Sequence, residues 1–329
     1  MNKIIIENLP YDEVKDKIER AASVTILSHL NPDADTLATA LGIYALLSRD
    51  KKLKVEVVNA STDLPLHLDF LPNFKKIKHH MDYTDSLILS CDCGSVDRLG
   101  FDLEGRDIIN IDHHQSNTRY GSINVVIPEY ASASQVAFIL LKVLYPIYPD
   151  AATCFYTALL SDTRFFTTSS VNEEVFAVAK ELVQLGALPD EIARQFTQRR
   201  PLSSLRILER ALGSLSLHHD AKIAALMVTK EDISASGARV PDMEGIVDYA
   251  RSLATVEIAI FAMELERGIR ISLRSKKVDV SKVAMAFGGG GHKVAAGFTL
   301  DHMGSQCGLQ ESIDTILRKI EELGLLNEK

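Results

Sequence analysis

Residues 106–114 read RDIINIDHH, a short apolar run that ends in an aspartate and two histidines. A continuous run of β-branched residues is typical of a strand buried on both faces of a parallel sheet. Three similar runs precede it: SVTILSH at 23–29, KVEVVNA at 54–60 and DSLILSCD at 85–92. A helical pattern from Asp35 to about Ser48 separates the first two, so the sequence predicts a parallel α/β sheet with crossover helices.

The pattern changes along the rest of the chain. Beyond Ser132 it is helical, and from residue 222 strand-like runs return, ending in an amphipathic helix from about Leu309 to Leu323. We therefore predict a parallel-sheet N-terminal domain (1–195), a helical connector (196–216) and a smaller α/β C-terminal domain (217–329). An active site is expected in the cleft between the two domains.

The composition limits the classes of protein. The chain has 329 residues, 46% of them hydrophobic, which suffices for a large core. It contains no apolar run of membrane-spanning length, and acids occupy the place of a signal peptide's apolar segment, so we expect a cytoplasmic protein without a membrane partner. Its cysteines do not form a disulfide framework: Cys91, Cys93, Cys154 and Cys307.

The formal charge of −8 argues against a protein that coats long nucleic acid, because such binding needs many Lys or Arg contacts to phosphate. A small anionic substrate stays compatible with this charge if positive charge is supplied locally. Bound metal ions are one such supply.

The loop HLNPDAD, residues 29–35, carries His29, Asp33 and Asp35 directly after the first predicted strand. Ligand-binding groups gather at the carboxyl ends of parallel strands, so these side chains are candidate metal ligands. Each also has a purely structural interpretation: His29 as a strand-end residue, Asp33 as a turn residue and Asp35 as a helix N-cap. For any one of them alone the structural interpretation is favoured.

Two other strands end in comparable residues. Asp92 follows the strand at 85–92, where an aspartate often caps a helix, so it is a weak signal alone. Asp112, His113 and His114 in succession are difficult to explain by packing.

Asp162 ends an apolar helix, where the helix dipole disfavours a carboxylate, and this favours a ligand role.

Taken in order, HLNPDAD, Asp92, the DHH at 112–114 and the SDT at 161–163 resemble the motifs of the DHH phosphoesterase superfamily. GGGGHKVAAGF at 288–298, preceded by ISLRS, resembles the signature of the DHH-associated second domain. The resemblance covers about residues 20–320. Its length and the EGIVDYARS segment are similar to the nano-RNase and 3'-phosphoadenosine-5'-phosphate phosphatase group.

The resemblance implies a site for two divalent cations. His29 and Asp33 would bind the first ion, Asp35, His113 and Asp162 the second, and Asp92 would bridge both. His114 would contact the phosphate or assist the leaving group, with Asp92 and His114 as the catalytic residues, and Asp112 would orient a histidine.

Oxygen and imidazole ligands suit Mn²⁺, with Mg²⁺, Co²⁺ or Fe²⁺ as alternatives. A metal-bridging hydroxide would be the nucleophile. The chain departs from the family at Arg164, where glycine is usual, and this leaves the local loop shape open.

In the second domain, the glycine run at 288–291 allows its backbone to approach an anion closely. Taken alone, a flexible turn is the preferred interpretation. The resemblance adds Gly289, Gly290, Gly291, His292 and Arg274 as expected substrate contacts. Arg98 is a weaker candidate for a phosphate contact.

The predicted substrates are short oligoribonucleotides or 3'-phosphoadenosine-5'-phosphate. Linear or cyclic di-AMP is the alternative. A RecJ-like exonuclease, a pyrophosphatase and a non-catalytic nucleotide-binding protein are less favoured, the last because all six candidate ligands are present. The sequence leaves open whether the protein forms a homodimer.

Overall fold

The computed structural model describes residues 9–266, 268–301 and 308–326. Residues 1–8, on which part of the signal-peptide argument rests, and Cys307 lie outside these ranges. The chain divides into two compact units, and the division falls between Arg199 and Arg200.

The first unit is built on a six-stranded sheet in which every described pair of neighbouring strands is parallel. Its order is β3-β2-β1-β4-β5-β6, so the chain moves outward from β1 in one direction and from β4 in the other. Ligand sites of open α/β sheets lie where the order reverses, beyond the carboxyl ends of these two strands. The strands are β1 (Ser23–Ser28), β2 (Lys54–Val58), β3 (Ile77–Lys78), β4 (Leu87–Cys91), β5 (Ile108–Asp112) and β6 (Ile123–Val126).

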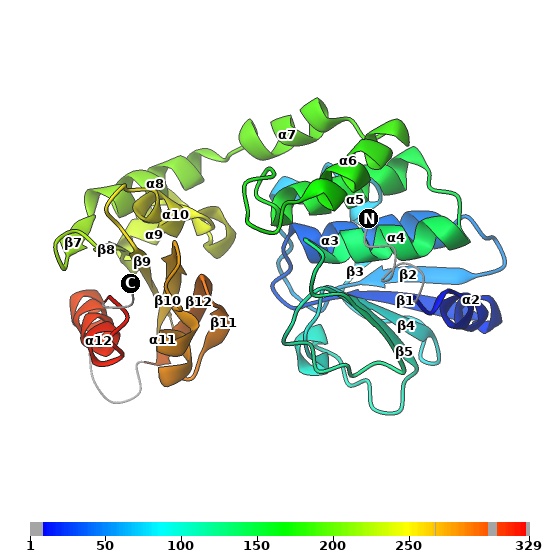
Figure 1. Ribbon diagram of the computed structural model, residues 1–329, viewed down its shortest axis with the longest axis horizontal. Helices are drawn as coiled ribbons and strands as arrows, with labels where there is room; N and C mark the ends of the chain where they lie inside the picture. The colour runs from blue at the N-terminus through cyan, green and yellow to red at the C-terminus, as the bar shows by residue number, and fades with distance from the viewer. Residues whose placement is uncertain (1–8, 267, 302–307, 327–329) are drawn as a thin grey trace. The chain divides into compact units, whose positions relative to one another are not determined.

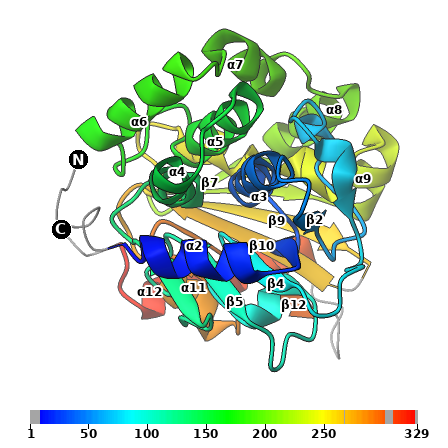
Figure 2. The ribbon, with the colours of Figure 1, turned by 90° about the vertical axis from the view of Figure 1, so that its right-hand side faces the viewer.

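Helices cover one face of this sheet. Helices α3, α4 and α5 pack against one another over it, while α6 and α7 pack on α5 (Figure 1, Figure 2). The opposite face packs against Leu99, in η3, and Leu103. The helices of this unit are α2 (Tyr11–Arg20), α3 (Ala34–Leu47), α4 (Ala133–Leu144), α5 (Pro149–Asp162), α6 (Glu173–Gln184) and α7 (Pro189–Thr197), with short 3-10 turns η1 (Leu66–Leu68), η2 (Phe74–Lys76) and η3 (Val96–Leu99).

The second unit has a mixed sheet of order β11-β12-β10-β9-β8-β7. One face packs on α11 and α12, and on the other face β8 and β9 pack on α8 and α10. Its strands are β7 (Ser216–His218), β8 (Ile223–Val228), β9 (Ile258–Leu265), β10 (Gly268–Ser275), β11 (Gly290–His292) and β12 (Ala295–Asp301). Its helices are α8 (Leu202–Gly213), α9 (Lys230–Ser236), α10 (Ile246–Arg251), α11 (Ser281–Ala286) and α12 (Leu309–Glu322), with the 3-10 turn η4 (Val240–Met243).

These elements confirm the predicted α/β class, a parallel sheet followed by a smaller mixed α/β unit. The predicted connector, 196–216, contains α8, which packs on the second sheet through Ile207 and Ala211. None of the helices within the described ranges is both long and apolar enough to cross a membrane.

The structural interpretation of the glycine run as a flexible turn is wrong for part of it. Gly290–His292 forms strand β11, which pairs with β12 in a hairpin. The glycines are needed for close packing, because a Cβ on Gly289 would lie 2.3 Å from the carbonyl oxygen of Gly297.

Candidate metal centre

The loop between β1 and α3 positions the first group of side chains. His29 is 4% exposed, and its Nδ1 lies 2.8 Å from the carbonyl oxygen of Leu30. A carbonyl only accepts, so Nδ1 carries the proton and Nε2 is left as a potential ligand atom. Nε2 lies 3.6 Å from Asp92 and 3.9 Å from Asp33.

The two aspartates of this loop are held in different ways. Asp33 is the N-cap of α3, accepting a 3.1 Å hydrogen bond from the backbone of Thr36, so the structural interpretation of Asp35 as the cap is wrong. Asp35 is buried in the first turn instead. Its carboxylate accepts backbone hydrogen bonds from Ala133 and Ser134, at 2.7 and 3.2 Å, at the start of α4.

Asp92 follows β4 in a left-handed backbone conformation, with φ of 54°. Such a conformation is uncommon for a residue other than glycine, and strain of this kind concentrates at functional sites. The side chain is 3% exposed, and its buried Oδ1 accepts no hydrogen bond from any residue in the described ranges. A buried carboxylate oxygen without a donor indicates a missing cationic partner.

Asp112 is the last residue of β5, and His113 and His114 follow it with different hydrogen-bond partners. His113 donates from Nδ1 to the carbonyl oxygen of Tyr130 at 3.2 Å, as His29 does to Leu30, and its Nε2 lies 3.5 Å from Asp92. His114 donates from Nδ1 to Asp112 at 2.7 Å. Asp112 therefore orients His114, while a backbone carbonyl orients His113.

Asp162 is the last residue of α5, and its carboxylate lies 3.6 Å from Nε2 of His113. Asp35 lies 3.8 Å from the same nitrogen. The helix thus ends with a carboxylate close to His113, which directly follows β5.

The structure brings all six predicted ligands together in two groups, His29–Asp33–Asp92 and Asp35–His113–Asp162, and a third group joins Asp92 to residues 112–114. Two ligands about 2.1 Å from one ion, at tetrahedral or wider angles, lie about 3.4–4.2 Å apart, which includes the separations observed here. Both imidazoles direct Nε2 toward an oxygen of Asp92, and this nitrogen becomes a ligand atom when a bound cation displaces its proton. The donor set and its geometry fit divalent cations.

The charge of these groups supports the same conclusion. Burial alone would lower the pKa of His113, but Asp92, Asp35 and Asp162 raise it to about 10. Burial would raise the pKa of Asp92, but the nearby imidazoles of His113 and His29 lower it. Protons on the histidines therefore balance the carboxylates when no metal is bound, and a cation would replace them.

Arg98, the weaker candidate from the sequence, lies beside the first group. Its Nη2 is 3.4 Å from Nδ1 of His29, and the side chain is otherwise largely exposed. It adds a positive charge behind a predicted ligand.

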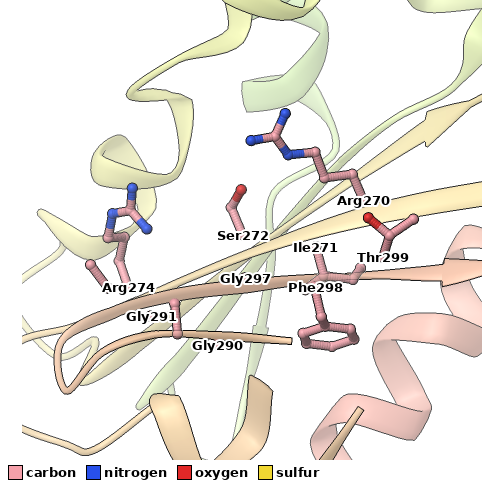
Figure 3. Close-up of a pocket in the computed structure, with 11 residues that line it drawn as sticks. Arg270, Ile271, Ser272, Arg274, Gly290, Gly291, Gly297, Phe298 and Thr299 are labelled. Atoms are coloured by element: carbon pink, nitrogen blue, oxygen red, sulfur yellow. The ribbon is translucent and has the colours of Figure 1, made fainter. Parts of the chain in front are cut away.

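In the second unit, a cavity of about 380 Å³ lies on the face of β10 and β12 (Figure 3). Of the predicted substrate contacts, Arg274, Gly290 and Gly291 line it. Gly289 and His292 are described but are not among its lining residues.

Arg270 and Ser272 were not among the predicted substrate contacts, yet they also line this cavity. Figure 3 shows their side chains on the same face of β10 as Arg274. The two-residue alternation of RISLR, 270–274, would have identified them, because residues i, i+2 and i+4 of a strand share a face.

Comparisons with known proteins agree with this geometry. Residues 23–159 match the DHH family, N-terminal domain, and residues 220–323 match the DHHA1 domain. The chain is 30% identical to the bifunctional oligoribonuclease and PAP phosphatase NrnA of Thermus thermophilus, with 92% of each chain covered. It is 22% identical to the protein of the same name from Bacillus subtilis, covering 84% of this chain and 89% of that protein.

Among solved structures, an exopolyphosphatase-related protein from Bacteroides fragilis superposes with a TM-score of 0.86 at 27% identity. The match covers 95% of this chain and 96% of that protein. The shared architecture thus extends through both units.

Proposed function

The chain belongs to the DHH family of phosphoester hydrolases, and from this premise we propose that it cleaves short oligoribonucleotides and 3'-phosphoadenosine-5'-phosphate with two divalent cations, Mn²⁺ above all. The observation that carries the proposal is the buried Asp92 carboxylate between two histidines, His29 and His113, whose Nδ1 protons are both directed to backbone carbonyls.

Asp92 would be shared by the two ions, with His29 and Asp33 completing one site and residues 35, 113 and 162 the other. Bound divalent ions supply positive charge and Lewis acidity, which lower the pKa of an attacking water and offset the charge of the phosphate. Six ligands that are all oxygen or imidazole suit Mn²⁺.

The chain's own groups would orient the substrate. The Asp112 carboxylate holds His114 through Nδ1 at 2.7 Å, so its Nε2 is the nitrogen that could contact a phosphate or leaving group. In the second unit, Arg274 and the backbone of Gly290 and Gly291 would bind another phosphate or the terminal nucleotide, with His292 as a further contact.

The substrate class follows from the relatives and from charge. The Thermus thermophilus relative is named an oligoribonuclease and PAP phosphatase, and both activities concern small nucleotides. This chain is acidic overall, yet residues 222–300 contain 11 Lys or Arg against 9 Asp or Glu, which suits local anion binding and not a long polyanion.

The test is a substrate panel with metal-stripped protein and added Mn²⁺: di- to pentaribonucleotides, 3'-phosphoadenosine-5'-phosphate, linear pApA and cyclic di-AMP. We expect no hydrolysis without metal, and the fastest hydrolysis of the first two classes with it. Full activity in excess chelator would contradict the metal proposal, and a preference for cyclic di-AMP would contradict the substrate proposal.

A matched pair of variants separates substrate binding from chemistry. Arg274→Ala and His292→Ala should reduce kcat/KM for oligoribonucleotides about 10-fold or more while sparing a small aryl phosphodiester, because contacts remote from the reacting bond act through orientation. Equal losses on both substrates, in folded and metal-loaded protein, would show that these residues do not position the nucleotide.

A further inference from the structure

The turn that follows Asp162 has an unusual backbone. Arg164, Phe165 and Phe166 all lie in the left-handed region, with φ of 45°, 58° and 61°. Side chains with a Cβ disfavour this region, and three such residues in succession are rarer still. The departure at Arg164 is therefore part of a strained turn directly after a predicted metal ligand.

The end of α5 fixes this turn. The backbone N–H groups of Arg164 and Phe165 donate to the carbonyl oxygens of Ser161 and Leu160, at 2.9 and 2.8 Å. These bonds close the last turn of the helix that carries Asp162. The turn and the ligand thus form one locally rigid piece.

The Phe165 ring belongs to a group of four aromatic side chains that we call the aromatic rim: His67, Phe70, Phe165 and Phe196. Phe165 meets Phe196 edge to face, with ring centroids 5.8 Å apart, and Phe196 also contacts Phe70 and His67. Phe165 nevertheless stays 42% exposed. The contact with Phe196 supports the ring without burying it.

The aromatic rim is joined to the metal centre along the chain from both sides. Phe165 follows Asp162 by three residues. On the other side, the loop from β2 to η1 begins at Asn59, whose side chain donates a hydrogen bond to the carbonyl oxygen of His29 at 2.9 Å. The backbone N–H of Asn31 donates to Ser61 of the same loop at 2.8 Å. These bonds hold the start of the segment that leads to His67 and Phe70 against the backbone of His29 and Asn31.

We propose that Phe165 stacks on a nucleobase of the substrate whose phosphate is bound at the metal centre. The inference rests on the proposed function, because only a nucleotide substrate brings a base to this place. Every base has a π-face that an exposed aromatic ring can cover. Packing against α7 alone would account for a buried ring, but it does not account for an exposed phenylalanine kept in a strained conformation.

The experiment compares kcat/KM of the wild type and Phe165→Ala with Mn²⁺ on a diribonucleotide and on two analogues, each lacking one base. A stacked base contributes about 1–3 kcal/mol, so Phe165→Ala should lose about 5- to 150-fold on the intact substrate. The loss should disappear on the analogue that lacks the stacked base and persist on the other. Such non-additivity is the signature of a direct contact.

Three further variants control for packing. Phe165→Tyr and Phe165→Trp should stay close to wild type, whereas Phe165→Leu, which keeps an apolar side chain without a π-face, should behave like Phe165→Ala. Phe176→Ala removes another exposed aromatic side chain, 55% exposed with its ring against Phe166, and should match wild type on all three substrates.

Unchanged kinetics of Phe165→Leu, or equal losses on the intact substrate and both analogues, would overturn the stacking role. If the wild type cleaves an aryl phosphodiester but no diribonucleotide, the proposed substrate class fails, and the stacking role fails with it. The two failures are distinguished by the wild-type enzyme alone.

Discussion

Asp92 is buried, has a left-handed backbone conformation and lies next to two imidazoles. Asp92→Asn keeps its size and tolerates the same backbone but removes the negative charge. Because this carboxylate would serve both ions, we expect kcat/KM to fall at least about 100-fold, beyond what outer-sphere partners usually cost. Metal content per folded chain should fall in parallel.

The control is Asp33→Asn, which removes a ligand of only one ion and should retain the other. If Asp92→Asn kept near wild-type turnover while Asp33→Asn lost it, the shared position of Asp92 would be wrong.

Arg164 offers a direct measure of backbone strain. Arg164→Gly and Arg164→Ala both delete the side chain, and they differ only in the cost of a φ of 45°. The glycine variant should be more stable than the alanine variant by about 1 kcal/mol in urea unfolding. Equal stability would show that the turn relaxes in solution.

The sequence was sufficient to predict which residues form the candidate site, but not which backbone groups hold their side chains in place. That His29, Asp92 and His113 meet follows from strand ends at one edge of a sheet. The backbone donors that hold Asp35 come from Ala133 and Ser134, about 100 positions along the chain, and no local pattern specifies such a contact. Ligation itself stays a prediction for all six residues.

At the level of secondary structure, predictions succeeded where periodicity was strong. The apolar strands β1, β2, β4 and β5 and helix α3 were predicted within about two residues. Strand β3 has two residues and β6 four, too short for a periodic pattern to stand out. Strand β11 consists of two glycines and His292, and glycines give no side-chain alternation to detect.

The β11–β12 hairpin yields a prediction about glycine packing. A Cβ at Gly289 would lie 2.4 Å from Cβ of Phe298, as well as close to the backbone of Gly297, and neither can move without disturbing the sheet. Gly289→Ala should therefore destabilise the second unit by about 1–3 kcal/mol, measured by denaturant unfolding.

Gly290→Ala is the matched control, because a Cβ there has no neighbour within 4 Å among the described residues. It should leave the free energy of unfolding nearly unchanged. Equal destabilisation by both substitutions would show that loss of chain flexibility, and not a steric clash, explains the glycines.

Stability of the whole molecule should depend on whether metal occupies the centre. Without metal, burial and, to a smaller extent, repulsion from Asp92 raise the pKa of Asp35 well above its usual value. Burial and the neighbouring carboxylates also raise the pKa of Asp162, to about 7, although His113 opposes this rise. An acid whose pKa is higher in the folded state binds more protons there than in the unfolded chain. Its contribution to stability is complete below about pH 4 and is lost as the pH rises through the folded value.

The metal-free protein should consequently melt at progressively lower temperature from about pH 5 to pH 8, and His113, with its pKa of about 10, adds to the fall above about pH 6.5. Saturating Mn²⁺ should remove most of this fall, since a cation stabilises the ionised carboxylates and the neutral histidine. Melting curves in chelator and in Mn²⁺ across this range provide the measurement, and Asp35→Asn in chelator should show a shallower fall. A metal-free melting temperature that rises from pH 5 to pH 8 would mean that the carboxylates do not repel one another in the folded protein, and the charge argument for the metal centre would fail.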